Sequence, residues 1–219
     1  GRKLTFANPK FLPRLAICDP ELTLGLPPML TAATGMDAIT HCIEAVLATP
    51  ANPPAEGIGL DGLWRGWRHI KRAVGNGSDR TARWEMMMAS TEGALAFVKG
   101  LGAVHSMSHA AGRIKELRLH HGTLNAVILP TILRFNEEAC LDVYPRLRQA
   151  MGLAANADLA KAVEQLNADL GLPRGLSEMG LTEELIEDMV PHAINDLATM
   201  TNPKTVSYTH LTLPTSYAV

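Results

Sequence analysis

Residues 30–48, LTAATGMDAITHCIEAVLA, carry the pattern that decides the fold. Their apolar side chains recur at the spacing of one helix face, at Met36, Ile39, Ile43, Val46 and Leu47. A period close to ~3.6 residues is typical of an amphipathic α-helix. We therefore predict a helix over about residues 30–48.

Helical patterns dominate the rest of the chain. They recur in residues 58–74, 80–98, 105–109, 157–170 and 180–190. Residues 124–136 are strongly apolar but are interrupted by Pro130. Near the start, Leu15–Ile17 is a short apolar run that ends at Asp19-Pro20, which predicts a strand and a turn. The sequence predicts an all-α, helical bundle-like domain preceded by one short strand.

Composition narrows the class of protein. The chain has 219 residues, 47% hydrophobic and 19% charged, which fits a globular domain with a substantial core. Its net charge of −2 gives no electrostatic footprint for nucleic acid or an anionic membrane. No apolar run approaches the ~18 residues that span a bilayer. The three widely spaced cysteines fit a reducing, cytoplasmic location.

The two ends of the sequence predict that the chain divides into three segments. The opening letters GRKLTF resemble the middle of a chain, so we expect residues 1–20 to be a linker and the last strand of an upstream domain. Residues 21–206 form the expected helical domain. The tail, residues 207–219, resembles the translation of a sequencing adapter, so we expect it to be non-native and exclude His210 from any site.

Histidines gather near the middle of the chain. Residues 100–122 hold four of the chain's eight histidines. Asp37 and His41 lie four residues apart on the first predicted helix, so both project from one face. His105 and His109 repeat that spacing on another helix. Two such pairs predict a metal site more strongly than either pair alone does.

The donor types indicate which ions suit such a site. A carboxylate with neutral imidazoles suits Fe²⁺, Zn²⁺ or Mn²⁺, and the absence of cysteine ligands argues against structural zinc. Glu44 lies on the same helix as Asp37 and is one candidate for orienting a histidine. Cys42 is expected to be a buried thiol. The alternative for Asp37 is a capping-box arrangement with Thr34.

Three blocks together resemble the iron-containing (group III) alcohol dehydrogenases. They are DPELTLGLPPMLTAATGMDAITHCIEAVLA (19–48), GLGAVHSMSHAAG (100–112) and HHGTLNAVILPTILRFN (120–136). The resemblance implies the C-terminal domain of a two-domain enzyme. Its N-terminal α/β domain would bind NAD or NADP through a glycine-rich loop, which this sequence does not contain. We therefore expect the isolated chain to be inactive.

The resemblance also assigns roles to single residues. Asp37, His41, His105 and His121 match the metal ligands of the family, and His109 matches the histidine placed near nicotinamide and substrate. The interval before the HG histidine is longer than the usual one, so His120 is the alternative fourth ligand. The letters NA that follow HG favour His121.

The implied reaction is hydride transfer between a small alcohol or aldehyde and NAD or NADP. The bound cation, Fe²⁺ first and Zn²⁺ or Mn²⁺ as alternatives, would polarise the substrate oxygen, and His109 would relay a proton. The full-length protein would be a homodimer. Two other enzymes on this fold are alternatives, one like maleylacetate reductase and one like dehydroquinate synthase. A third alternative is a non-catalytic helical domain with histidines on its surface.

Overall fold

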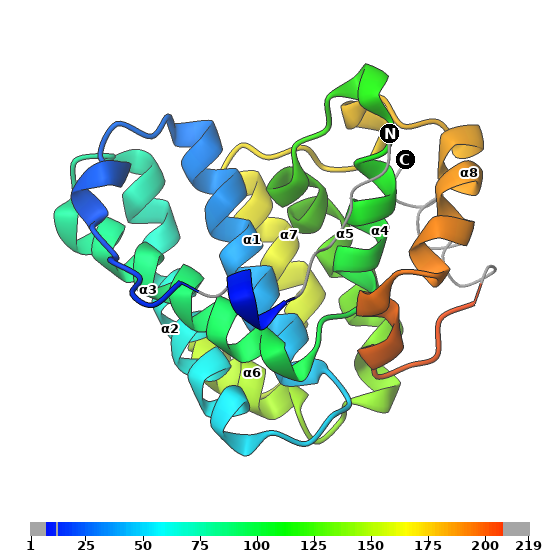
Figure 1. Ribbon diagram of the computed structural model, residues 1–219, viewed down its shortest axis with the longest axis horizontal. Helices are drawn as coiled ribbons and strands as arrows, with labels where there is room; N and C mark the ends of the chain where they lie inside the picture. Colours follow the sequence, from blue (N-terminus) through cyan, green and yellow to red (C-terminus); the bar gives the residue numbers. More distant parts are fainter. Residues whose placement is uncertain (1–7, 12, 208–219) are drawn as a thin grey trace.

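The computed structural model describes residues 8–11 and 13–207, and within them it contains eight α-helices and no strand (Figure 1). The prediction of an all-α domain is confirmed. The helices are α1 Pro28–Leu47, α2 Pro53–Gly75, α3 Arg80–Ala96, α4 Ala103–Ala111, α5 His121–Asn136, α6 Tyr144–Met151, α7 Leu159–Asp169 and α8 Glu183–Ile194.

The predicted N-terminal strand is wrong. Residues 15–17 adopt neither helix nor strand, and Leu15 and Ile17 are 75% and 81% exposed. A strand needs a neighbour to accept and donate its backbone hydrogen bonds, and the described part of the chain offers no other strand. The tail expected to be non-native lies outside the described residues except for Ser207.

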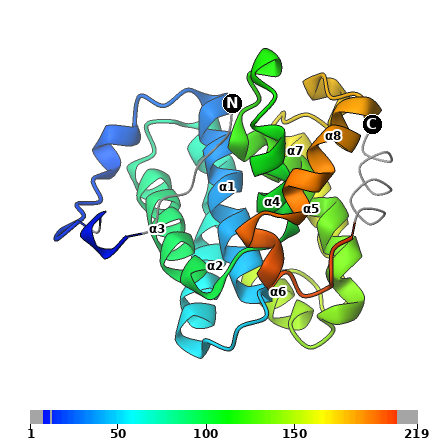
Figure 2. The same ribbon diagram turned by 45° about the vertical axis from the view of Figure 1, so that its right-hand side comes forward.

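Helix α1 is the centre of the arrangement. It packs against α2 and α3 on one side and against α5 on another, and α4 contacts α5 and α8. Figure 2 shows α1 standing between α3 and the pair α4 and α5. Helix α7 covers α5, and α6 covers α2. Residues far apart in the sequence therefore meet where α1, α4 and α5 approach one another.

Glycines allow α1, α2 and α3 to approach closely. A Cβ atom at Gly62 of α2 would lie 2.8 Å from the Cys42 sulfur of α1. A Cβ atom at Gly93 of α3 would lie 3.0 Å from the His41 Cβ atom. Both distances are shorter than atoms in a packed core tolerate. The missing side chains thus set the spacing of these helices and hold His41 close to α3.

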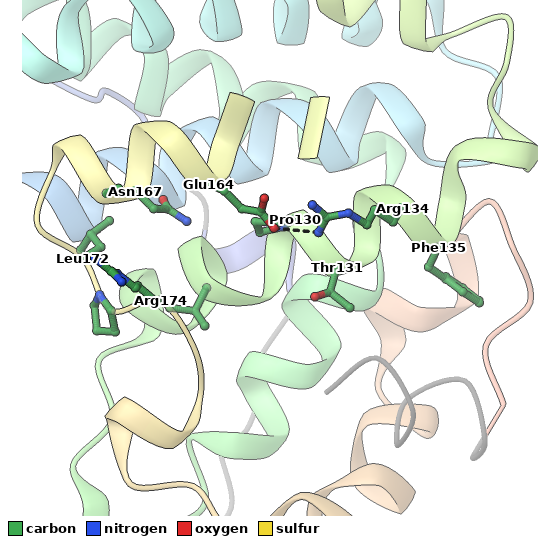
Figure 3. Close-up of a pocket in the computed structure, with 11 residues that line it drawn as sticks. Pro130, Thr131, Arg134, Phe135, Glu164, Asn167, Leu172 and Arg174 are labelled. Carbon is green, nitrogen blue, oxygen red and sulfur yellow. Dashed lines mark ion pairs between the residues drawn. The ribbon is translucent and has the colours of Figure 1, made fainter. Parts of the chain in front are cut away.

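Helix α5 continues through Pro130, which the sequence suggested would interrupt it. Proline lacks the N–H that would donate to the carbonyl of Ala126, one turn earlier. The Asn167 amide of α7 donates to that carbonyl instead, at 2.7 Å. Pro130 and Asn167 also line a cavity of about 810 Å³ between the two helices (Figure 3). A side chain from α7 therefore compensates for the lost helical hydrogen bond.

Several local predictions are confirmed. The Thr182 hydroxyl accepts the N–H of Leu185 and caps α8, and Gly171 ends α7 with a φ of +69°. Cys42 is buried, and its thiol donates to the Ala89 carbonyl at 3.7 Å. Among the described residues, no helix has both the length and the apolar character needed to cross a membrane.

Candidate metal centre

Helix α1 contributes a carboxylate and an imidazole to a compact cluster. Asp37 Oδ1 and His41 Nε2 lie 4.0 Å apart on one helix face. With His105 they form a group whose candidate ligand atoms all lie within 4.8 Å of one another. The Thr34 hydroxyl donates to the Leu30 carbonyl inside α1, so the capping-box alternative for Asp37 is wrong. The pair faces the junction with α4 and α5.

Helix α4 places His105 against this pair. Its Nε2 atom lies 3.5 Å from Asp37 Oδ1, and its ring stacks on the His41 ring with centroids 4.5 Å apart. The His105 side chain is only 1% exposed. This burial contradicts the alternative in which the histidines decorate the surface.

Glu44 fixes the orientation of His105, a role that the sequence left open for it. Its Oε2 atom lies 2.6 Å from His105 Nδ1, and its Oε1 atom accepts the N–H of Val104 at 2.8 Å. The carboxylate therefore binds both the ring and the first turn of α4, where N–H groups lack helical partners. The contact of Nδ1 with Glu44 leaves the other ring nitrogen, Nε2, on the side of the ring that faces Asp37.

Helix α5 brings in His121. Its Nε2 atom lies 3.6 Å from Asp37 Oδ1, and its Nδ1 atom lies 3.1 Å from the Ser108 hydroxyl. His120 lies immediately before the helix and is exposed. The geometry thus favours His121 over His120 as a fourth ligand.

His109 lies at the edge of the cluster. Its ring stacks on that of His121 with an interplanar angle of 12° and meets that of His105 at 69°. Its Nδ1 atom is 3.1 Å from Asp196 Oδ2, and its side chain is 22% exposed. His109 is therefore oriented by a carboxylate while part of its ring remains accessible.

The electrostatics of the cluster favour a positive charge. Burial raises the pKa of Asp37, but the hydrogen bond from His105 and the nearby His41 and His121 outweigh it and hold the pKa well below its usual range. Burial lowers the pKa of His105, but its bonds to Asp37 and Glu44 raise it to about 9. Burial and the neighbouring His105 lower the pKa of His41 to about 4.

The donor set fits a first-row divalent cation. One carboxylate oxygen and two imidazole nitrogens, from Asp37, His41 and His105, lie within 4.8 Å of one another, and His121 Nε2 lies 3.6 Å from the same Asp37 oxygen. Carboxylate and imidazole together suit Fe²⁺, Zn²⁺ and Mn²⁺. The cluster also has the outer hydrogen bonds, from Glu44 and Ser108, that usually orient histidine ligands.

Two polar residues of the site were missed by the sequence analysis. Asn125 lies one turn after His121 and contacts Asp37, and Asp196 contacts His109. The spacing of Asn125 from His121 is the same helical signal that identified the histidine pairs. For Asp196 the sequence holds no such signal, because 87 residues separate it from His109.

Comparison with known proteins places the chain in a family. Residues 31–213 match the model of the Fe-containing alcohol dehydrogenase family, C-terminal. The chain therefore belongs to this family of oxidoreductases, as its sequence motifs indicated.

Individual relatives agree with the assignment. The chain is 56% identical to a 4-hydroxybutyrate dehydrogenase of Cupriavidus necator, over 94% of the chain and 56% of the relative. It is 36% identical to an NAD-dependent methanol dehydrogenase of Bacillus methanolicus, over 92% of the chain and 55% of the relative. A solved structure of a 1,3-propanediol oxidoreductase is 32% identical to the chain, with a TM-score of 0.87. The match covers 92% of this chain and 55% of the solved one. The chain spans about half the length of these relatives.

Proposed function

We propose that this chain is the metal-binding part of an NAD(P)-dependent alcohol dehydrogenase. The observation that carries the proposal is the close grouping of Asp37, His41 and His105, with His121 3.6 Å from the Asp37 carboxylate. These four side chains would bind one divalent cation, with Fe²⁺ as the first candidate and Zn²⁺ or Mn²⁺ as alternatives. A cation held there supplies Lewis acidity toward a substrate oxygen.

The surrounding side chains would prepare the site. Glu44 would hold the His105 ring through Nδ1 and leave Nε2 for a cation, and Ser108 contacts the outer nitrogen of His121. His109, oriented by Asp196, would contact the substrate and the nicotinamide from the edge of the cluster. The rest of the full-length protein would bind NAD or NADP.

We infer that the substrate is a small primary alcohol or its aldehyde, and that the enzyme acts in the cytoplasm as a homodimer. The relatives are named for 4-hydroxybutyrate and methanol, both short alcohols. A hydroxy acid such as 4-hydroxybutyrate is therefore the first substrate to test. Hydride from its alcohol carbon would pass to the nicotinamide.

Metal content tests the site directly. The purified chain is loaded anaerobically with Fe²⁺ or Zn²⁺, washed and analysed for bound metal, with circular dichroism to confirm folding. We expect about one equivalent in the wild type and in His120→Ala, and none in His121→Ala. Retention by His121→Ala together with loss by His120→Ala would reassign the fourth ligand. A folded wild type without metal would refute the proposal.

A chimera tests the reaction. This chain replaces the corresponding half of the Cupriavidus necator 4-hydroxybutyrate dehydrogenase, which is 56% identical to it. We expect reduction of NAD or NADP with 4-hydroxybutyrate, followed by nicotinamide absorbance, and its loss in His109→Ala. A folded, metal-loaded chimera that reduces maleylacetate but oxidises no alcohol would instead favour the maleylacetate-reductase alternative.

A further inference from the structure

Asn125 lies at the centre of the proposed ligand set. It is fully buried, and its amide nitrogen is 2.6 Å from Asp37 Oδ1. The same nitrogen is 3.2 Å from His105 Nε2 and 3.2 Å from His121 Nε2. A single amide group therefore contacts three of the four atoms proposed to bind a cation.

The chemistry of this contact depends on whether a cation is present. Without one, the amide nitrogen donates a hydrogen bond to the Asp37 carboxylate and lies against two imidazole rings, which links side chains of three helices. An amide nitrogen has no free lone pair, and its hydrogens repel a cation. A cation bound by Asp37, His105 and His121 would therefore meet an unfavourable group in this orientation.

The other end of the amide explains how the conflict is resolved. Asn125 Oδ1 is buried and has no hydrogen-bond partner among the described residues. A buried amide oxygen without a partner loses its hydrogen bonds to water, so such atoms call for an explanation. Rotation of the terminal amide exchanges its oxygen and nitrogen, and this torsion is broad and roughly two-fold. An amide oxygen is also a suitable donor to a divalent cation.

We propose that Asn125 sets the metal affinity of the site. Its amide nitrogen holds Asp37, His105 and His121 together in the metal-free protein, and its oxygen faces the cation in the loaded protein. This inference rests on the proposed metal site and adds a residue to it.

The test compares Co²⁺ binding in three forms of the chain by competition with a chelator, together with the visible spectrum of bound Co²⁺. Asn125→Leu removes both amide atoms, and Asn125→Asp keeps an oxygen without the N–H donor. We expect Asn125→Leu to weaken binding at least ~10-fold, which is typical for groups around metal ligands, and to change the Co²⁺ bands. We expect Asn125→Asp to bind at least as tightly as the wild type.

Asn167 offers a matched control. It too is buried, donates through its nitrogen and leaves its oxygen without a partner among the described residues, but it lies at Pro130 and not at the cluster (Figure 3). Asn167→Leu should reduce stability and leave Co²⁺ affinity and spectrum unchanged.

The outcomes separate the two proposals. A wild type that binds no Co²⁺, Fe²⁺ or Zn²⁺ would refute the metal site and this inference together. A wild type that binds metal, with Asn125→Leu binding equally well or more tightly, would refute the role of Asn125 alone. If Asn125→Leu does not fold, a tenfold loss of affinity in Asn125→Asp would refute it instead, because the N–H donor would then be the group that matters.

Discussion

Helix α1 has two packed sides that are built differently. Toward α2 and α3, contact depends on absent side chains: Gly62 and Gly93 leave room for Cys42 and His41. Toward α4 and α5, contact depends on polar groups, because Asp37 and Glu44 bind residues of those helices. The first side is sensitive to added volume, whereas the second is sensitive to the loss of hydrogen bonds.

Gly122 lies on the polar side but is sensitive to added volume. Its substitution gives the largest predicted effect. A Cβ atom at Gly122 of α5 would lie 2.2 Å from the Ala33 carbonyl oxygen of α1, and backbone atoms cannot move aside cheaply. We expect Gly122→Ala to lower the free energy of unfolding by about 3 kcal/mol or more. Because α5 also carries His121, metal affinity should fall with it. Urea unfolding and metal analysis measure the two losses.

Gly57→Ala is the control for this change. Gly57 lies in α2, and a Cβ atom there would have nothing within 4 Å. Alanine has the higher helix propensity, so this variant should gain about 0.5–1 kcal/mol and keep its metal. Equal stability of Gly122→Ala and the wild type would show that α1 and α5 are not in close backbone contact.

The same methyl group on the other side of α1 should separate stability from metal binding. At Gly62 it would lie 2.8 Å from the Cys42 sulfur and 3.0 Å from Glu92 Cβ, both side-chain atoms that can shift. We expect Gly62→Ala to cost about 1–3 kcal/mol by overpacking. The atoms that must shift belong to Cys42 and Glu92 and not to a proposed ligand, so the folded variant should bind metal as the wild type does. A large loss of metal affinity in this variant would show that the two sides are coupled.

Sequence patterns predict the two sides of α1 unequally. Apolar periodicity locates the helix, and the Asp37–His41 spacing identifies its polar face. The partners of that face come from α4 and α5, and nothing local in the sequence specifies which residues of these helices meet it. Asn125 shows most clearly what the sequence does not reveal. It lies four residues after His121, on the same helix face, but an amide side chain is not an obvious member of a metal site.

The wrong and incomplete predictions have physical causes of the same kind. The run at Leu15–Ile17 has strand composition, but a strand forms only beside another strand. Pro130 was expected to interrupt its helix, but α5 continues because Asn167 supplies the missing donor from α7. In each case a residue distant in sequence decides the local outcome.

The smallest predicted effect compares a buried carboxylate, Glu44, with a half-buried one, Glu92. Glu44 on the polar side binds a histidine and backbone N–H groups, whereas Glu92 on the α2–α3 side keeps one oxygen without a partner among the described residues. Burial raises the pKa of Glu92 from 4.5 to about 7, and the negative Asp61 adds to the effect, although Arg65 partly offsets it. Glu92 is thus the less well satisfied of the two.

The sign of its pH dependence follows from linkage. Between about pH 4.5 and pH 7 the folded protein keeps a proton on Glu92 that the unfolded chain has released, so stability falls as pH rises through this window. Glu92→Gln removes this loss. Because solvent reaches the Glu92 side chain, we expect Glu92→Gln to be more stable than the wild type by only about 1 kcal/mol at pH 8. At pH 4.5 we expect the two proteins to be equally stable. Urea unfolding at the two pH values measures the difference.

Glu85 contacts the same Arg65 side chain as Glu92 but provides the opposite case. It is paired with Arg65 at 2.7 Å, so Glu85→Gln should lower stability at pH 8, where Glu92→Gln raises it. If both variants lower stability at pH 8, Glu92 would be satisfied in the folded protein. The α2–α3 side would then tolerate buried charge as well as the metal-binding side does, and the contrast between the two sides would be one of volume alone.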